Sequence, residues 1–344
     1  MNANRRKDED LNNCNEIKVI LMLLIILYHS CVFWTGEWFT CNPAEESVMM
    51  SIFAKWLNTF HIYGFTLISG YIYYYVYFER KGYTTFLGYI KKKFRRLLVP
   101  YFMIALIWVI PIQNLIFGYD TIYIIKNYFF GCSPNQLWFL LMLFGVSIIF
   151  YPLTKFMKNN SSIIIVFIFY IFGFIFINKV GNYFMLGRVF EYITFFWLGF
   201  NIRSERFKFV WKIPTPLYIF THFTFFALTQ ICTLIGSTFC NYLMFLTNFS
   251  TNIVGAIAIF IILQRFIEKN RSLTKQVISR FSKISMPIYL FHQQLIYIPI
   301  LLFNGVMNPM IIMIICFCFS LFGATLLSLL FMKFKTTILI IGEK

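Results

Sequence analysis

The chain has 344 residues, of which 59% are hydrophobic and only 12% are charged, and its mean hydropathy is +0.72. A soluble domain carries about 25% charged residues, so this composition excludes a water-soluble enzyme, a disordered chain and a disulfide-built secreted module. It predicts a polytopic membrane protein. The formal net charge is +17, so basic residues are in large excess and their positions along the chain have to be explained.

The sequence predicts an all-α fold with about ten transmembrane helices. The apolar runs are continuous rather than alternating, which favours helices over the strands of a barrel. We expect spans near residues 17–34, 51–78, 95–117, 135–155, 162–178, 187–202, 213–235, 248–267, 285–304 and 309–332. No sizeable soluble domain fits beside them, so residues 1–344 are predicted to form one membrane domain with tails 1–16 and 333–344.

The basic residues predict the topology. Alternate segments hold 26 of the 30 Lys and Arg. These segments are 1–18, 79–96, 155–161, 203–212, 265–283 and 333–344. Cytoplasmic loops are enriched in Lys and Arg, so both termini are predicted to be cytoplasmic. The positive charge is therefore a topology signal first, and we expect no nucleic-acid partner.

The first predicted span carries two polar residues on one face. Lys18 and His29 are eleven residues apart, which on an α-helix is a rise of about 16.5 Å and a net rotation of about 20°. A polar residue inside a span is costly and is a functional candidate by default. A neutral imidazole also suits proton transfer. The alternative is that His29 hydrogen-bonds between helices while Lys18 extends to the surface.

A run of five cations, Lys91-Lys92-Lys93-Phe94-Arg95-Arg96, precedes the third predicted span. The plain interpretation is a cytoplasmic topology signal. The functional interpretation is that Lys93 and Arg96, three residues apart, share a helix face. Near a helix N-terminus such a pair can hold phosphates with help from backbone N–H groups, and it would suit a large anionic cofactor.

Other polar residues in the spans have a structural and a functional interpretation. Ser69 lies in Phe65-Thr66-Leu67-Ile68-Ser69-Gly70-Tyr71, where helix packing is a sufficient explanation. Trp138 is typical of an interfacial anchor. Arg188 and Glu191 are three apart and can form an ion pair.

The remaining histidines and the cysteines are less informative. His292 lies inside the ninth span, whereas His61 and His222 are interpreted as packing residues. Cys41, Cys132 and Cys240 fall in predicted outer loops and could form a disulfide, although unpaired packing is expected for most of the eight cysteines. No metal-ligand cluster, Ser-His-Asp spacing or Gly-rich phosphate loop is present.

Taken in order, these features resemble the integral membrane acyltransferase-3 family, over most of the chain. The resemblance rests on the first-span basic residue and histidine, the Ser-Gly-Tyr of span two, and the basic run leading into Leu97-Leu98-Val99-Pro100-Tyr101. Leu137-Trp138-Phe139-Leu140 and Tyr289-Leu290-Phe291-His292 extend it. The most similar members are short ones that O-acetylate bacterial surface glycans.

The resemblance implies acyl transfer from acyl-CoA, with acetyl-CoA expected, to a hydroxyl of an extracytoplasmic carbohydrate such as a capsule. His29 falls at the position of the family's essential histidine. Lys18 falls where the family usually has Arg, and Lys93 and Arg96 fall at the ends of its Arg-x-x-Arg motif. Where this chain has Lys18 and Lys93 in place of the family's Arg, the positive charge is kept, but the planar guanidinium that can bind phosphate with two N–H groups is lost.

The expected site combines these residues. We expect His29, Glu191 and His292 in catalysis, Lys18, Lys93, Arg95 and Arg96 in acyl-CoA binding, Ser69 and Trp138 in substrate binding, and no metal. His29 acts either as a general base or as a transiently acylated nucleophile. The implied location is a bacterial cell membrane.

Two other classes of function stay open. A transporter or flippase for a glycan or small molecule also uses buried charge near the midplane of the bilayer. A non-catalytic subunit of a glycan export assembly would have these polar residues only for packing.

Overall fold

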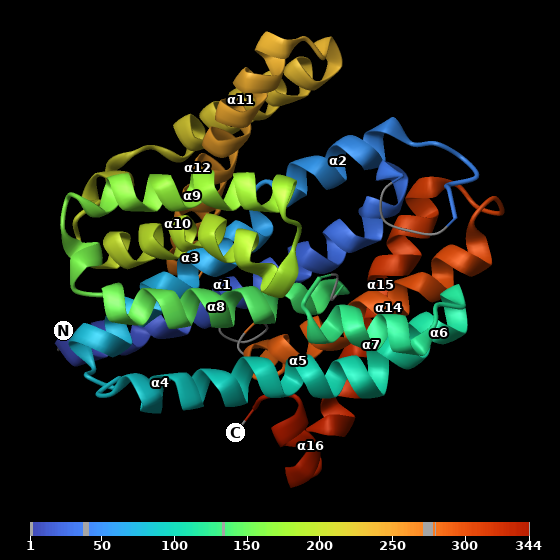
Figure 1. The fold of residues 1–344 in the computed structure, drawn as a ribbon, viewed down its shortest axis with the longest axis horizontal. Coiled ribbons are helices and arrows are strands. Elements are labelled where there is room, and N and C mark those ends of the chain that lie inside the picture. Colours follow the sequence, from blue (N-terminus) through green and yellow to red (C-terminus); the bar gives the residue numbers. More distant parts are fainter. Residues whose placement is uncertain (1–2, 37–40, 133–134, 271–277, 279, 344) are drawn as a thin grey trace.

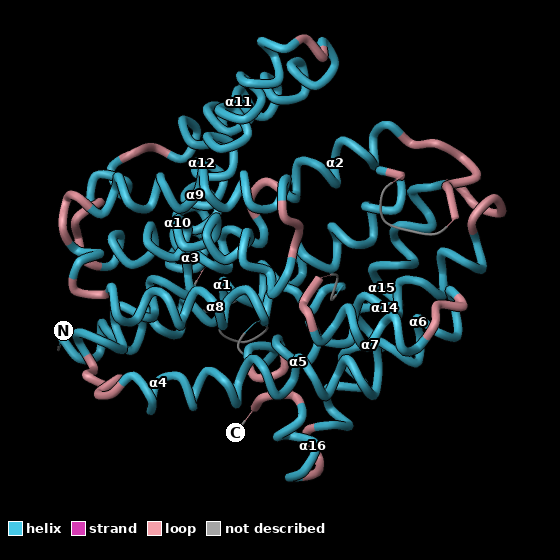
Figure 2. Tube along the Cα trace, viewed as in Figure 1, coloured by secondary structure: helices cyan, strands magenta, loops and turns pink. Residues whose placement is uncertain are grey.

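The computed structural model describes residues 3–36, 41–132, 135–270, 278 and 280–343. Within these ranges the regular structure is entirely helical, without a strand, which confirms the predicted all-α class (Figure 2). Residues 1–2 and 344 of the predicted tails, and residues 271–277 and 279 of the predicted loop 265–283, lie outside the described residues.

The α-helices of the described residues mostly follow the predicted apolar runs, except for three short ones at 86–93, 121–129 and 335–340. They are α1 (Ala3–Cys31), α2 (Val48–Asn58), α3 (His61–Tyr74), α4 (Phe86–Lys93), α5 (Val99–Ile104), α6 (Ile110–Phe117), α7 (Thr121–Phe129), α8 (Trp138–Leu153), α9 (Ser162–Lys179), α10 (Leu186–Arg203), α11 (Thr215–Ile235), α12 (Thr238–Lys269), α14 (Ser285–Phe303), α15 (Pro309–Phe331) and α16 (Lys335–Ile340). Single π-helical segments extend or join some of them: η2 (Tyr75–Glu79), η3 (Phe94–Leu98) and η4 (Ala105–Val109).

Side-chain caps fix where several helices begin. Ser47, Thr85, Asp120 and Ser237 each accept a hydrogen bond from a backbone N–H in the first turn of the helix that follows. Such caps satisfy donors that the helix itself leaves unpaired. Helix α11 ends at Gly236, which adopts the left-handed conformation that glycine tolerates best.

Eight helical segments in the described ranges are long and apolar enough to cross a membrane. The protein is therefore a multi-pass membrane protein. The second and sixth predicted spans are helical but are not among the eight. Helix α10, the sixth, carries Arg188, Glu191 and Arg203, which lower its hydropathy. The count of ten and the cytoplasmic termini stay predictions.

The second predicted span, 51–78, is broken into α2 and α3. The Thr59 hydroxyl donates to the carbonyl of Trp56 and contacts Nε2 of His222 at 2.9 Å. Gly255 of α12 packs so closely that a Cβ there would lie 3.0 Å from the Thr59 carbonyl oxygen. Side-chain bonding to the preceding turn and packing against other helices thus favour a break where the sequence reads as a continuous apolar run.

The third predicted span begins earlier than expected. Residues Phe86–Phe117 form one 32-residue helical segment with Thr85 as its cap. Lys93 and Arg96 therefore lie two to three turns inside the helix rather than at its N-terminus. The N–H of Phe94 already donates to the carbonyls of Ile90 and Lys91. The expected help from free backbone N–H groups in holding phosphates is thus wrong.

Helix α1 lies at the centre of the bundle (Figure 1). It contacts α2, α3, α12, α14 and α15, while α10 packs against α3, α8 and α9. Helices α11 and α12 pack against each other, and their hairpin projects from the rest of the molecule in the same view. The C-terminal α16 packs against α5.

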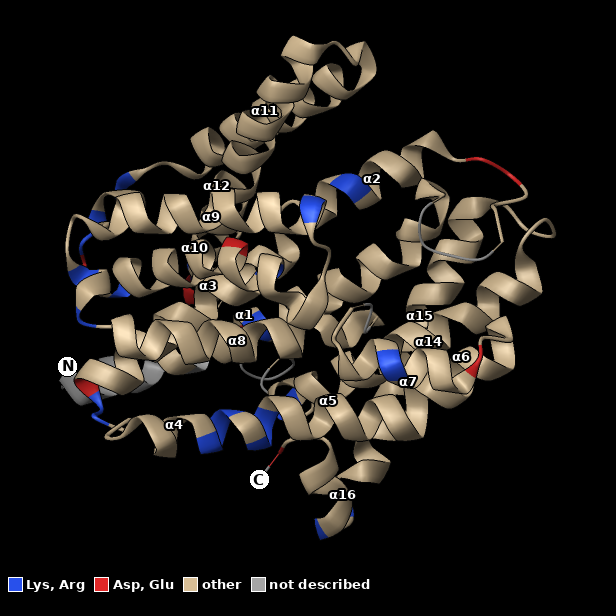
Figure 3. Cartoon of the chain, viewed as in Figure 1, with Lys and Arg blue, Asp and Glu red and all other residues tan. Residues whose placement is uncertain are grey.

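Lys and Arg gather at one end of the bundle, the end at which α1 begins and α4 starts (Figure 3). The eight cysteines, all within the described residues, form no disulfide bond. The disulfide considered for Cys41, Cys132 and Cys240 is therefore not formed. The side chain of Cys240 instead lies near that of Cys232, across the turn between α11 and α12.

Candidate functional site

Helix α1 contributes side chains to the linings of two cavities. Its continuous course from Ala3 to Cys31 keeps Lys18 and His29 on one face, as the spacing predicted, about 16.5 Å apart along the axis. Lys18 lines a cavity of about 180 Å³, here called the basic chamber. His29 lines a second cavity of about 360 Å³, here called the histidine chamber.

The basic chamber collects three of the predicted cations. Lys18 comes from α1, Lys93 from the end of α4 and Arg96 from η3, and all three line the cavity. Lys93 Nζ also lies 5.5 Å from the centre of the Tyr89 ring, a cation–π distance that helps to place it. Arg95 is exposed and is not part of the lining. The structure thus brings together Lys18, Lys93 and Arg96 but not Arg95.

The rest of the basic chamber is largely apolar. Its wall includes Phe65, Ile72, Leu140 and Leu143. Ser69 also lines it, and its hydroxyl donates to the Phe65 carbonyl at 2.9 Å within its own helix. The chamber therefore combines a cluster of positive charges with apolar walls.

The C-terminal segment lies near two cations of the basic chamber. Gly342 packs on the helix there, since a Cβ at this glycine would lie 2.6 Å from the Arg96 carbonyl oxygen. The adjacent Glu343 feels the charges of Arg96 and Lys18, which favour its ionised form. Burial outweighs them and raises the pKa of the Glu343 carboxyl above its usual 4.5. A carboxyl group is thus placed near two of the three cations, Lys18 and Arg96.

The histidine chamber holds two histidines. His29 and His61 both line it, and the ring of Tyr28 packs between them, 5.0 Å from the centre of His29 and 4.7 Å from that of His61. His61 Nδ1 donates to the Leu57 carbonyl at 2.5 Å, which leaves its Nε2 as the acceptor nitrogen. The structure places His61 of α3 in the wall of this cavity, and the prediction that it is a packing residue stays a prediction.

His292 lies next to His29 but is not part of the cavity lining. It is fully buried, and its ring centre lies 5.1 Å from that of His29. Its Nδ1 donates to the Tyr289 carbonyl at 2.6 Å, so Nε2 carries the lone pair. Within the described part of the chain this Nε2 has no hydrogen-bond partner. The structure thus pairs His292 with His29, two residues that the sequence places in separate spans.

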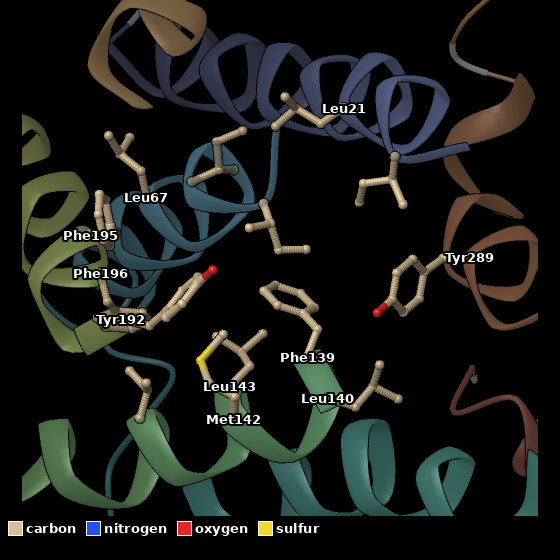
Figure 4. Close-up of a cluster of buried hydrophobic side chains, with 14 of the residues drawn as sticks. Leu21, Leu67, Phe139, Leu140, Met142, Leu143, Tyr192, Phe195, Phe196 and Tyr289 are labelled. Atoms are coloured by element: carbon tan, nitrogen blue, oxygen red, sulfur yellow. The ribbon is translucent and has the colours of Figure 1, made fainter. Parts of the chain in front are cut away.

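The two chambers share the lining residues Ile25 and Tyr289, here called the neck. Tyr289 donates its hydroxyl to the Gln136 carbonyl. The Gln136 side chain exchanges two hydrogen bonds with Gln294, of 2.7 and 3.0 Å. Figure 4 shows Tyr289 of α14 and Phe139 of α8 pointing into the space beneath α1. A buried amide pair thus supports the backbone to which Tyr289 of the neck is bonded.

Glu191 lies apart from His29. It pairs with Arg188, whose Nη1 is 3.1 Å from Oε2 of Glu191. Arg188 lines the histidine chamber, whereas Glu191 does not. Trp138 also lines this chamber, with its ring 5.6 Å from that of Tyr192. The described structure gives no contact between Glu191 and His29, so it does not support Glu191 as a residue that orients His29 directly.

Several residues of the site are not evident from the sequence. Ile25, Tyr289 and the Gln136–Gln294 pair matter because helices distant in the chain converge on them. The amide side chains in one short stretch of α14, Gln293 and Gln294, are the one signal that pointed there. Among the described residues no cluster of three His, Cys, Asp or Glu is arranged to hold a metal ion.

The comparisons with known proteins give one match. A family model described as an acyltransferase domain, of the acyltransferase-3 type, matches residues 15–332. No curated protein and no solved structure matches the chain. The matched segment contains both chambers and every cation and histidine that lines them.

Proposed function

The chain belongs to the acyltransferase-3 family, and on that premise we propose that it O-acylates a carbohydrate across a membrane. The acyl group, an acetyl group in the first instance, comes from cytoplasmic acyl-CoA. The acceptor is a hydroxyl of a surface glycan on the other side of a bacterial cell membrane. The observation that carries the proposal is that helix α1 presents Lys18 to a chamber with two further cations and His29 to the next chamber, and that the two linings share Ile25 and Tyr289.

The basic chamber is the donor site in this proposal. Acyl-CoA is rich in phosphate, and hydrogen bonds between ionised partners are about twice as strong as neutral ones. Lys18, Lys93 and Arg96 meet the phosphates at the cytoplasmic mouth. The apolar walls accept the pantetheine arm, which carries the thioester towards Ile25 and Tyr289. The basic chamber must then face the cytoplasm, in agreement with the predicted topology.

The histidine chamber is the acceptor site. An imidazole nitrogen of His29 takes the proton of an acceptor hydroxyl as its oxygen attacks the thioester carbonyl carbon. The carbon–sulfur bond breaks, and the CoA thiolate leaves and recovers the proton from His29. In the alternative route His29 itself displaces the thiolate and then passes the acyl group to the hydroxyl. His292, behind His29, acts as a positioning residue in both routes.

The proposal is tested by transfer of radiolabel from acetyl-CoA to a surface glycan with purified protein in detergent. His29→Ala should lower the transfer rate at least about 100-fold, the typical contribution of a general acid–base group. His222→Gln is the matched control, because His222 lies outside both chambers and packs against Thr59. Its rate should equal that of the native protein.

Three results would count against the proposal. Equal transfer by the native protein and His29→Ala removes His29 from the mechanism. Absence of label with every acyl-CoA tried, together with movement of the glycan across proteoliposomes, makes the protein a transporter. Absence of both, with glycan export lost in cells that lack the protein, makes it a non-catalytic subunit.

A further inference from the structure

The charge in the histidine chamber bears on which acceptor enters it. Among the described residues that line this cavity, Arg188 alone carries a formal charge. Glu191, its partner, is not part of the lining. The Arg188 side chain is 39% exposed and that of Glu191 only 10%. The guanidinium therefore belongs to the cavity wall while the carboxylate stands behind it.

The position of Glu191 is fixed by the contact between α9 and α10. A Cβ on Gly173 of α9 would lie 3.0 Å from Cγ of Glu191 and 2.5 Å from the Gly187 carbonyl oxygen. Only a glycine at position 173 leaves room for the carboxylate arm. Glu191 is thus held between the two helices, and as the ion-pair partner of Arg188 it fixes the position of the guanidinium.

The guanidinium keeps most of its hydrogen-bonding capacity. Arginine has five N–H donors in a planar fork that matches a carboxylate. The described structure shows one hydrogen bond from it to another side chain, from Nη1 to Glu191. The remaining donors lie at the wall of a cavity of about 360 Å³, a size typical of small-molecule sites.

The uncharged part of the wall suits hydroxyl groups. Oδ1 of Asn182 and Oε1 of Gln293 are buried, and neither has a hydrogen-bond partner in the described part of the chain. Both residues line the histidine chamber. A buried acceptor without a donor is costly, and a ligand hydroxyl relieves that cost. The Trp138 and Tyr192 rings, 5.6 Å apart in the same wall, add apolar faces against which a sugar ring can pack.

We propose that the histidine chamber selects an acidic sugar, one whose carboxylate pairs with Arg188 while a hydroxyl is presented to His29. Asn182 and Gln293 receive other hydroxyls of the same sugar. The inference rests on the proposed function for its reaction, but the binding of an acidic sugar is measurable without any turnover.

The test compares a glucuronate-containing oligosaccharide with its methyl ester, which has the same shape and hydroxyls but no charge. Binding is measured by calorimetry in detergent without acetyl-CoA, and transfer of label is measured separately. The native protein should bind the acid at least about tenfold more tightly than the ester, the order expected for a charge-assisted hydrogen bond. Arg188→Gln should abolish this preference and leave ester binding unchanged.

Two further variants serve as controls. Lys55→Gln removes an exposed cation outside the chamber and should keep the full preference. Because Arg188→Gln leaves the Glu191 carboxylate unpaired, the double variant Arg188→Gln/Glu191→Gln is measured beside it. The double variant should fold like the native protein and also lack the preference.

Equal binding of acid and ester by the native protein would overturn the inference, and so would a preference that survives in the double variant. Failure of the proposed function has a different signature. In that case the acid binds selectively through Arg188 while no acceptor becomes labelled from acetyl-CoA.

Discussion

The contact between α3 and α10 sets a sharp limit on residue size. A Cβ on Gly70 would lie 1.8 Å from the Phe196 carbonyl oxygen, and one on Gly199 would lie 1.8 Å from the Leu67 carbonyl oxygen. Each glycine thus faces the backbone of the other helix, which has no rotamer to yield. Gly70→Ala must push the helices apart by more than about 1 Å. Overpacking of a tight core costs about 1–3 kcal/mol, and a backbone neighbour favours the upper end of that range.

The measurement is thermal unfolding of the purified protein in detergent. A loss of about 3 kcal/mol should lower Tm by at least about 5 °C. Gly64→Ala is a matched control in the same helix, since a Cβ there meets only side-chain atoms, Ile259 Cγ2 at 3.0 Å and Leu21 Cδ1 at 3.4 Å. These groups can shift, so the change in Tm should be less than half as large.

Equal Tm values for Gly70→Ala and the native protein would refute the reasoning, because they would mean that α3 and α10 can separate at no cost. A Gly64→Ala variant as unstable as Gly70→Ala would refute it too. Ser69 lies beside Gly70, so the Gly70→Ala variant should also weaken acetyl-CoA binding at the basic chamber.

Two further predictions concern the path of the donor. Ile25→Trp fills the neck shared by the chambers, so the acyl transfer rate should fall more than about tenfold. Acetyl-CoA binding, measured by calorimetry, should stay within about twofold of that of the native protein. A transfer rate near that of the native protein would show that the acyl group does not pass there. Glu343→Gln removes a negative charge beside Arg96 and Lys18, so KM for acetyl-CoA should fall about two- to fivefold at neutral pH. Burial raises the pKa of the Glu343 carboxyl, which is ionised above that raised value and neutral below it. The KM of the native protein should therefore fall as the pH is lowered through this pKa. Below it, the difference in KM between the native protein and Glu343→Gln should vanish. A difference that persists at low pH would contradict this role of Glu343.

Much of the architecture is predictable because the bilayer demands long apolar helices. Spacing alone also places Lys18 and His29 on one face of α1, and the structure shows both lining cavities on that helix. The pairing of Lys93 with Arg96 follows from the same rule, although the helix begins at Phe86 and not beside them. These features depend on periodicity within a single helix, which the sequence contains directly.

Features that depend on how helices pack could not be predicted in this way. The break at Thr59 arises from its bonds to Trp56 and His222, not from a proline or glycine in the run. His61 and His292 approach His29 only because α3 and α14 both contact α1. Neither relation leaves a periodic signal in the chain.

The central claim is that the donor and the acceptor meet through the neck from opposite faces of the membrane. It is tested most directly in proteoliposomes that present acetyl-CoA to the face with the basic chamber and a glycan acceptor to the other face only. Labelled acceptor should form in the compartment without acetyl-CoA, and Ile25→Trp and His29→Ala should each prevent it. Acylation only when donor and acceptor share one compartment would contradict the claim.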